Sequence, residues 1–139
     1  MKVYNASLLR NTHGFNDIQD LTEDVTEIVN SSGVTNGNIT VFIPGSTVGV
    51  TTIEFETGAI EDFKKALERI APQDIYYSHN ARWGDGNGFS HVRSALLKPS
   101  LTIPIINGTI QLGTWQQIVI VDFDNRPRER EIIVQIIGE

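Results

Sequence analysis

Residues 103–112, Ile-Pro-Ile-Ile-Asn-Gly-Thr-Ile-Gln-Leu, decide the fold class because they hold an Asn-Gly pair between two runs of β-favouring residues. Asn-Gly is a preferred pair for a two-residue turn between antiparallel strands. Two further β-rich runs follow at residues 117–123 and 131–137. Within them, 118–121 and 132–137 are mostly apolar at consecutive positions, which indicates strands buried on both faces. Helices could cover one face, and a second sheet or a neighbouring subunit the other.

The rest of the chain alternates between strand and helix patterns. Strands are predicted at residues 2–9, 39–43 and 50–56, and the last two could pair across the loop at 45–49. Helices are predicted where apolar residues recur every three or four positions, at 21–33, 59–70 and 89–97. The sequence therefore predicts an α+β fold with a layered, mainly antiparallel sheet core and two to three helices.

Composition limits the class of protein. The chain has 139 residues, 40% of them hydrophobic, so residues 1–139 are expected to form a single domain. A net charge of −6 gives no general attraction for nucleic acids or anionic membranes. The absence of cysteine excludes disulfides and thiolate chemistry. No signal peptide or membrane span is evident, which favours a cytoplasmic protein.

Two of the three histidines stand on either side of an irregular central segment. His79 ends a β-like run at residues 74–78, and His91 lies near the start of a short helix. Imidazole binds metals and moves protons near neutral pH, and Asp85 and Asn87 between the two could orient the rings. A shared metal or catalytic site is one interpretation, and two unconnected surface histidines are the other.

Three other polar segments each allow two interpretations. The loop at residues 84–88 has three glycines and could present backbone N–H groups to an anion or simply turn, with Asn87 capping the next helix. Residues 44–47, Pro-Gly-Ser-Thr, could contact a phosphate or only connect two strands. The arginines could converge on a phosphate or pair with nearby acids; they are Arg126, Arg128 and Arg130.

Glu54 and Trp115 are further candidates. Strand alternation places Glu54 opposite its apolar neighbours, so exposure is expected, whereas a buried Glu54 would need a metal or histidine partner. Trp115 could stack on a heteroaromatic ligand or fill a core or subunit contact.

These motifs together resemble one known family. The resemblance rests on Tyr-Ser-His at 77–79, Asn-Gly-Phe-Ser-His at 87–91, Leu-Gly-Thr-Trp-Gln at 112–116, the arginines at 126–130 and the ending at 134–139. The chain resembles the YjbQ-like family, also named secondary thiamine-phosphate synthases, over nearly its whole length.

The resemblance implies a homotrimer and a weak activity that joins phosphorylated pyrimidine and thiazole halves of thiamine with loss of pyrophosphate. The implied enzyme is a transferase that uses a divalent ion, zinc or magnesium, held by His79 and His91. The catalytic residues would be Glu54, His79, Asn87 and His91, and the substrate would contact Ser46, Thr47, Asp85, Trp115 and Arg128. The alternative is a protein that binds a small phosphorylated metabolite without turning it over.

One position departs from the family pattern. Many members carry His-Thr-Thr where this chain has Gly45-Ser46-Thr47, and an Asn where it has Ile53. A chain without that histidine has a changed site, which favours the binding alternative.

Overall fold

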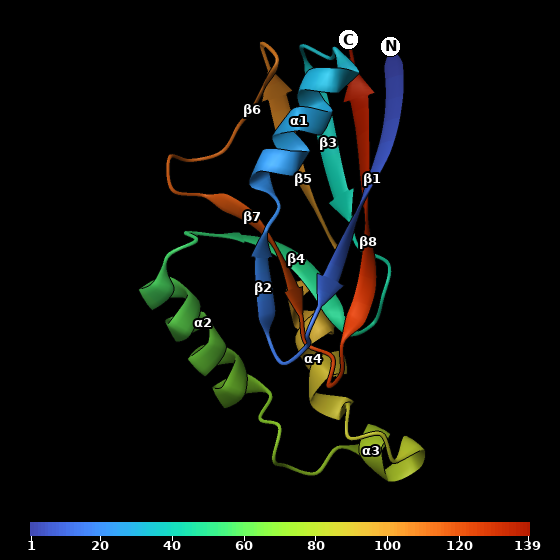
Figure 1. Cartoon of the computed structure of the whole chain (residues 1–139), viewed down its shortest axis with the longest axis vertical. Coiled ribbons are helices and arrows are strands. Elements are labelled where there is room, and N and C mark those ends of the chain that lie inside the picture. The colour runs from blue at the N-terminus through green and yellow to red at the C-terminus, as the bar shows by residue number, and fades with distance from the viewer.

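The protein is described by a computed structural model of residues 1–139. All strand pairs are antiparallel, and the strands form two sheets (Figure 1). The larger sheet has the order β1-β8-β3-β5-β6, formed by Lys2–Thr12, Arg128–Gly138, Gly37–Phe42, Ser100–Ile106 and Thr109–Ile110. The smaller sheet has the order β2-β7-β4, formed by Asp17–Asp20, Gln117–Asp122 and Val48–Ile53. The predicted α+β class and mainly antiparallel sheet are confirmed.

Four helices complete the fold, one more than the upper number predicted. They are α1 (Thr22–Ser32), α2 (Thr57–Ile70), α3 (Ser78–Trp83) and α4 (Gly88–Leu97). Helices α1, α2 and α4 match the three predicted helices, and Gly33 ends α1 in the left-handed conformation, with φ of 69°. None of the four is long and apolar enough to cross a bilayer.

The main core lies between the two sheets and under α1. It contains Val25 and Val29 of α1, Ile118 and Ile120 of β7, and Ile136 of β8. The alternate residues of β7, Val119 and Val121, belong to a second core together with Leu67 of α2, and Leu97 of α4 packs against it. Both faces of β7 are therefore buried as predicted, one by a sheet and the other by helices.

Strand β8, also predicted to be buried on both faces, is buried on only one face in a single chain. Its residues alternate between buried and accessible positions, and Ile137 is 43% exposed. The second face of β8 is therefore open in the single chain.

The predicted pairing of the two strands at 39–43 and 50–56 is wrong. Strand β3 lies in the larger sheet and β4 in the smaller one, because the loop between them carries the chain from one layer to the other. Strand β4 also ends at Ile53, before Glu56, whose side chain caps α2 instead. The two ends of β4 therefore lie in different parts of the molecule. The end at Val48 lies near α4, which donates a hydrogen bond from Ser94 Oγ to Val48 O over 2.6 Å.

Candidate functional site

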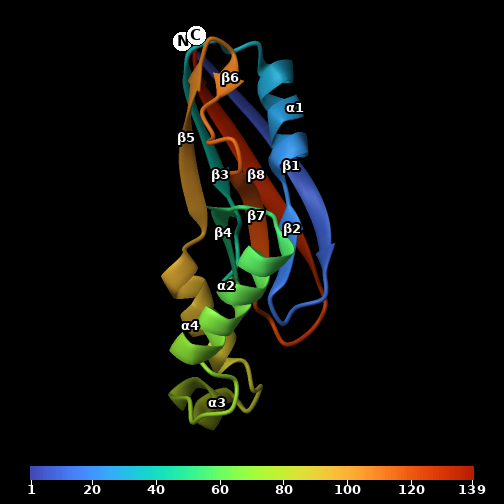
Figure 2. The ribbon, with the colours of Figure 1, turned by 90° about the vertical axis from the view of Figure 1, so that its left-hand side faces the viewer.

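Helices α3 and α4 carry the two central histidines at one end of the molecule (Figure 2). The β-like assignment of residues 74–78 is wrong: the segment has no strand, and His79 lies in the first turn of α3. Gly84 ends α3 with φ of 67° and donates its N–H to Asn80 O. Gly88 starts α4 so close to α3 that a Cβ would lie 2.5 Å from Tyr77 Cβ. A short, tightly packed connection therefore brings α3 against α4.

Three side chains converge in this connection. The rings of His79 and His91 lie with their centroids 4.3 Å apart, and His79 Nε2 lies 3.0 Å from Asp85 Oδ2. One ligand atom from each of His79, Asp85 and His91 lies within 4.8 Å of the others. Both imidazoles are half-buried and Asp85 is exposed, so the group is open to solvent on one side. We call these three residues the histidine cluster.

Asp85 is held in place by the turn in which it lies. Its Oδ1 accepts the Asn87 N–H over 3.1 Å, and its backbone carbonyl accepts a hydrogen bond from Asn125 Nδ2 over 2.7 Å. The hydrogen bond from the Asn87 backbone and that from His79 lower the pKa of Asp85 below its ordinary value. Asp85 is therefore ionised at neutral pH and offers a fixed carboxylate to the two rings.

Asn87 is buried, and its side chain bonds to groups outside the histidine cluster. It occupies the position before α4, but its side chain makes no cap to the helix backbone. Its Oδ1 accepts hydrogen bonds from Ser90 Oγ and from the Asn125 N–H. The predicted helix-capping role of its side chain is wrong. Asn87 instead joins the start of α4 to the loop between β7 and β8.

A buried ion-pair network lies beside this loop, and in it Arg128 and Arg130 pair with nearby acids, which is one of the two interpretations that the sequence allowed. Arg130 Nε donates to Asp122 Oδ2 over 2.7 Å, and Arg128 Nε donates to Asp124 Oδ2 over 3.0 Å. Both aspartates have no exposed surface. The alternation Asp-x-Asp followed by Arg-x-Arg in neighbouring strand ends was the signal for such pairing.

Thr47 belongs to the same network. Its Oγ1 donates to Asp124 Oδ2 over 2.8 Å and accepts from Arg130 Nη2 over 2.7 Å. Burial would raise the pKa of Asp124, but the Thr47 hydroxyl and the Arg128 charge hold it below its ordinary value. Thr47 and most of Arg128 are therefore engaged inside the protein, whereas Ser46 and Arg126 are exposed.

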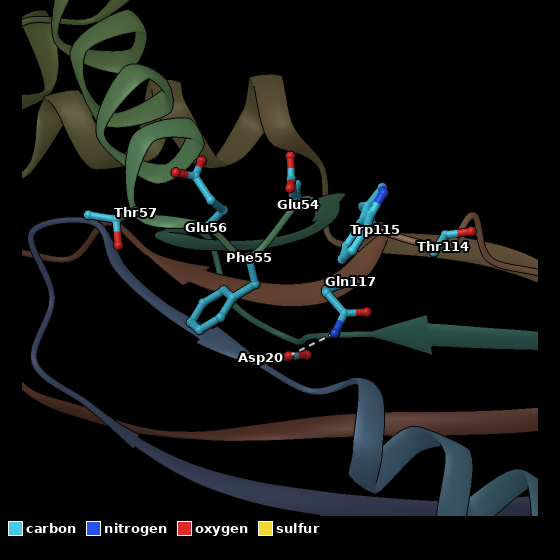
Figure 3. Close-up of a pocket in the computed structure, with 8 residues that line it drawn as sticks. All are labelled: Asp20, Glu54, Phe55, Glu56, Thr57, Thr114, Trp115 and Gln117. Carbon is cyan, nitrogen blue, oxygen red and sulfur yellow. Dashed lines mark hydrogen bonds between the residues drawn. The ribbon is translucent and has the colours of Figure 1, made fainter.

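Glu54 and Trp115 lie away from the histidine cluster, beyond the Ile53 end of β4. Glu54 is exposed, as expected, but it lies just beyond the end of β4, so its exposure does not come from strand alternation. The two residues line a pocket shown in Figure 3, which we call the Glu54 pocket. Its lining consists of Asp20, Glu54, Phe55, Glu56, Thr57, Thr114, Trp115 and Gln117. The single chain thus brings together His79, Asp85 and His91, with Asn87 behind them, but it does not bring Glu54 or Trp115 to them.

The chemistry of the cluster suits a divalent transition metal. Two imidazole nitrogens and one carboxylate oxygen are the ligand types that zinc accepts in catalytic sites, where three protein ligands leave a position open. Magnesium prefers oxygen ligands only, so it fits this set less well. The same groups could also pass a proton, because Asp85 orients the His79 ring.

Comparisons with known proteins agree over nearly the whole chain. A family model described as UPF0047 protein YjbQ-like matches residues 7–139. A UPF0047 protein from Methanothermobacter thermautotrophicus is 39% identical over 139 residues, covering 100% of this chain and 95% of the relative.

Solved structures give the same result. A crystal structure of a YbjQ-like protein of unknown function from Sulfolobus solfataricus P2 superposes with a TM-score of 0.94 at 31% identity, covering 99% of each chain. A hypothetical protein from Aeropyrum pernix K1 gives a TM-score of 0.91 at 29% identity, covering 98% of this chain and 99% of the other. The extent of these matches shows that the chain belongs to the YjbQ-like UPF0047 family.

Proposed function

We propose that the protein is a metal-dependent transferase that acts on phosphorylated heterocycles, with an activity of the thiamine-phosphate-synthase type. The observation that carries the proposal is the convergence of His79, Asp85 and His91, with one ligand atom from each within 4.8 Å of the others. Such a group of titratable side chains in an irregular connection between helices is typical of a functional site.

A divalent ion, with zinc favoured by the donor set, would be held by His79, Asp85 and His91. When bound, it would supply positive charge to neutralise a diphosphate leaving group. In the reaction the bond between the pyrimidine methylene carbon and the diphosphate oxygen breaks, and a bond from the thiazole nitrogen to that carbon forms. The products are thiamine phosphate and pyrophosphate, so atoms and charge balance without a further reactant.

The chain itself would supply orientation and phosphate contacts. Asp85 fixes the His79 ring through its 3.0 Å contact, and Asn87 fixes the start of α4 that carries His91. Ser46 is exposed, and Arg128 keeps 34% of its side chain exposed although it pairs with Asp124. Both groups are therefore available to phosphate oxygens, whereas Thr47 would act indirectly by holding the network.

A binding function without turnover is the second candidate, and Gly45 favours it. This residue replaces the histidine that many family members carry, and it has φ of 146°. A Cβ there would lie 2.9 Å from Val48 Cγ1 and 3.0 Å from Arg130 Nη1. The local backbone is therefore shaped for glycine and does not accommodate an imidazole. A binding site needs fewer reacting groups than a catalytic one, so the protein could retain ligand affinity without activity.

We also propose that the protein assembles as a homotrimer. The outer face of the larger sheet supports this, because most of its residues are uncharged and accessible. They include Val3, Ser7 and Leu9 of β1, Asn38 and Phe42 of β3, Thr102 and Pro104 of β5, and Gln135 and Ile137 of β8. A sheet face that is accessible and carries few charged residues, such as Glu129 and Glu131 at one end of β8, is suited to contact with another subunit.

The transferase proposal is tested with the variants His79→Ala and His91→Ala, and with His13→Ala as the matched control because His13 is exposed and outside the cluster. Zinc affinity is measured by competition with a chromogenic chelator, and product formation by chromatography of the mixed half-substrates. We expect each cluster variant to weaken zinc binding by about tenfold or more and to abolish turnover, while His13→Ala changes neither.

Two outcomes separate the alternatives. Ligand binding by calorimetry without any product would support the binding function and reject the transferase. Unchanged zinc affinity in both cluster variants would reject the metal site itself.

A further inference from the structure

The Glu54 pocket is a cavity of about 530 Å³, which is within the range of small-molecule sites. It is built from three separate parts of the chain: the connection from β4 to α2, the segment just before β7, and Asp20 at the end of β2. Strand β7 lies between β2 and β4 in the smaller sheet, so strand pairing fixes Asp20 and Gln117, whereas the other lining residues lie in the adjoining connections and at the start of α2. Neither the histidine cluster nor the ion-pair network reaches this cavity.

The charge of the pocket has a single sign. Three carboxylates line it, from Asp20, Glu54 and Glu56, and no lysine, arginine or histidine does. Glu56 accepts the Gly58 and Ala59 N–H groups over 2.8 and 2.7 Å, and these bonds lower the pKa of its carboxyl group.

The other two carboxylates differ in how they are engaged. Asp20 Oδ1 accepts the Thr22 N–H over 2.9 Å, and Asp20 Oδ2 accepts a hydrogen bond from Gln117 Nε2 over 3.3 Å. The Glu54 carboxylate lies in the pocket with neither a hydrogen bond nor an ion pair (Figure 3). Glu54 is therefore the free charge of the cavity.

Two aromatic rings complete the walls. Phe55 is 44% exposed and Trp115 is 72% exposed, which is high for residues that normally bury their surface. In Figure 3 the Trp115 indole stands beside Glu54, while Phe55 projects from the opposite side of the 54–56 segment toward Asp20. The face of an aromatic ring attracts cations, most strongly for tryptophan. The pocket thus combines π faces, a free carboxylate and apolar surface.

Neither a metal ion nor an anion fits this combination. The His79, Asp85 and His91 group is the one set of three or more potential metal ligands that converge in the chain, so the three pocket carboxylates do not form such a site. An anion would meet three carboxylates and no cationic side chain. An organic cation can use the Trp115 ring and the Glu54 carboxylate at once, because the two side chains stand beside each other (Figure 3).

We propose that the Glu54 pocket binds a small organic cation, such as a quaternary ammonium compound or a cationic heteroaromatic ring. Trp115 supplies a ring face beside Glu54, Glu54 supplies the opposite charge, and Phe55 adds apolar wall on the Asp20 side. Asp20 and Glu56 add negative potential while their oxygens remain bound to the backbone or Gln117. The proposal concerns binding in a cavity separate from the histidine cluster, so it stands or fails independently of the transferase proposal.

Choline and its neutral analogue 3,3-dimethylbutan-1-ol, in which carbon replaces the charged nitrogen, test the proposal directly. The protein has two tryptophans, so the variant Trp83→Phe leaves Trp115 as the sole indole reporter. We expect choline to change Trp115 fluorescence saturably, with a dissociation constant at least about fivefold lower than that of the neutral analogue. Equal affinity for the two compounds, or no saturable binding of choline, would overturn the proposal.

Variants then locate the site. In the Trp83→Phe background, Glu54→Gln is expected to weaken choline binding by about fivefold, because it removes the free charge and keeps the shape. Glu61→Gln is the matched control, since Glu61 is an exposed glutamate on α2 that pairs with Lys65.

Trp115→Leu, measured by calorimetry in the otherwise unchanged protein, is expected to weaken binding to a similar extent or more. Choline affinity that is the same with and without Glu54→Gln in the Trp83→Phe background would rule out the pocket. This outcome would decide the question even if Trp115→Leu failed to fold.

Discussion

At the scale of single residues, the buried aspartates explain how the β7–β8 loop is held behind the histidine cluster. Asp122 and Asp124 have no exposed surface, yet each has an arginine partner, and Thr47 bridges Asp124 and Arg130. A buried charge is tolerated only when it is paired and hydrogen-bonded. The loop that contacts Asn87 and Asp85 through Asn125 is therefore fixed from within the protein.

Replacing Asp124 tests this network. The folded-state pKa of Asp124 lies below its ordinary value of 3.8, so its contribution to stability is present above about pH 4 and is lost as the pH falls through the folded-state pKa. We expect Asp124→Asn to lower the free energy of unfolding at pH 7 by about 3 kcal/mol and to flatten its decline at acid pH. Urea unfolding at a series of pH values measures both effects.

The exposed Glu131 supplies the control for this prediction, because Glu131→Gln changes a carboxylate that has no ion-pair partner. A pH slope in Asp124→Asn equal to that of the unchanged protein would contradict the assigned role of Asp124.

At the scale of elements, the packing of α3 on α4 sets the distance between the two histidines. Gly88 is the contact point, because any side chain there would meet Tyr77 and Asn80. Its N–H also donates a hydrogen bond to Asn80 Oδ1 over 2.8 Å, which ties the start of α4 to α3. Tyr77 is itself anchored by its hydroxyl, which donates to Pro72 O over 2.6 Å, and burial raises the pKa of this phenol.

The variant Gly88→Ala is therefore expected to separate α3 from α4 and to weaken zinc binding by the histidine cluster by about tenfold. Overpacking of this kind typically lowers the free energy of unfolding by about 1–3 kcal/mol. Chelator competition and urea unfolding measure the two effects. Gly113→Ala is the control, because a Cβ there would lie no closer than 3.6 Å to any neighbour. Unchanged zinc affinity in Gly88→Ala would show that the helix contact does not position the rings.

Sequence patterns predicted the elements that are governed by local periodicity. Helices α1, α2 and α4 follow apolar spacing, and the Asn107-Gly108 turn of the β5–β6 hairpin has both residues at positive φ, 51° and 76°. Helix α3 was missed because its six residues are stabilised by contacts with α4, such as Asn80 to Gly88, and show no apolar period. Pairing of strands β3 and β4 was considered possible because no local feature distinguishes a turn from a crossing between layers.

The histidine cluster could be predicted because its residues are close in sequence, whereas contacts between distant segments could not. His79, His91, Asp85 and Asn87 lie within thirteen consecutive residues, so a short connection brings them near one another. The buried position of Asp124 depends on Thr47, 77 residues away in the sequence. The separation of Glu54 from the histidines depends on the direction in which β4 crosses the smaller sheet. Long-range placement of this kind leaves no pattern in a single sequence.

At the scale of the whole molecule, the open face of the larger sheet bears on assembly. Ile137 on β8 stands opposite Val3 on β1 and Asn38 on β3, and no charged residue lies in that row. A charge placed there would be costly to bury between subunits.

We expect the protein to elute in light-scattering chromatography with three times the 15.4-kDa mass of one chain. The variant Ile137→Lys is expected to shift it to the single-chain mass while circular dichroism stays unchanged. Ile70→Lys, at an exposed apolar position on α2, is the control and should leave the mass unaltered. A single-chain mass for the unchanged protein would reject the homotrimer.

The position of β8 has a consequence for the order in which the protein can fold. The strand nearest the C-terminus lies between β1 and β3 and pairs with both along most of their lengths. Until it emerges from the ribosome, β1 has no hydrogen-bonding partner and the larger sheet is divided in two. Pairings so distant in sequence form slowly. Completion of the larger sheet is therefore expected to wait until β8 has been synthesised, and removal of β8 should leave β1 open to aggregation.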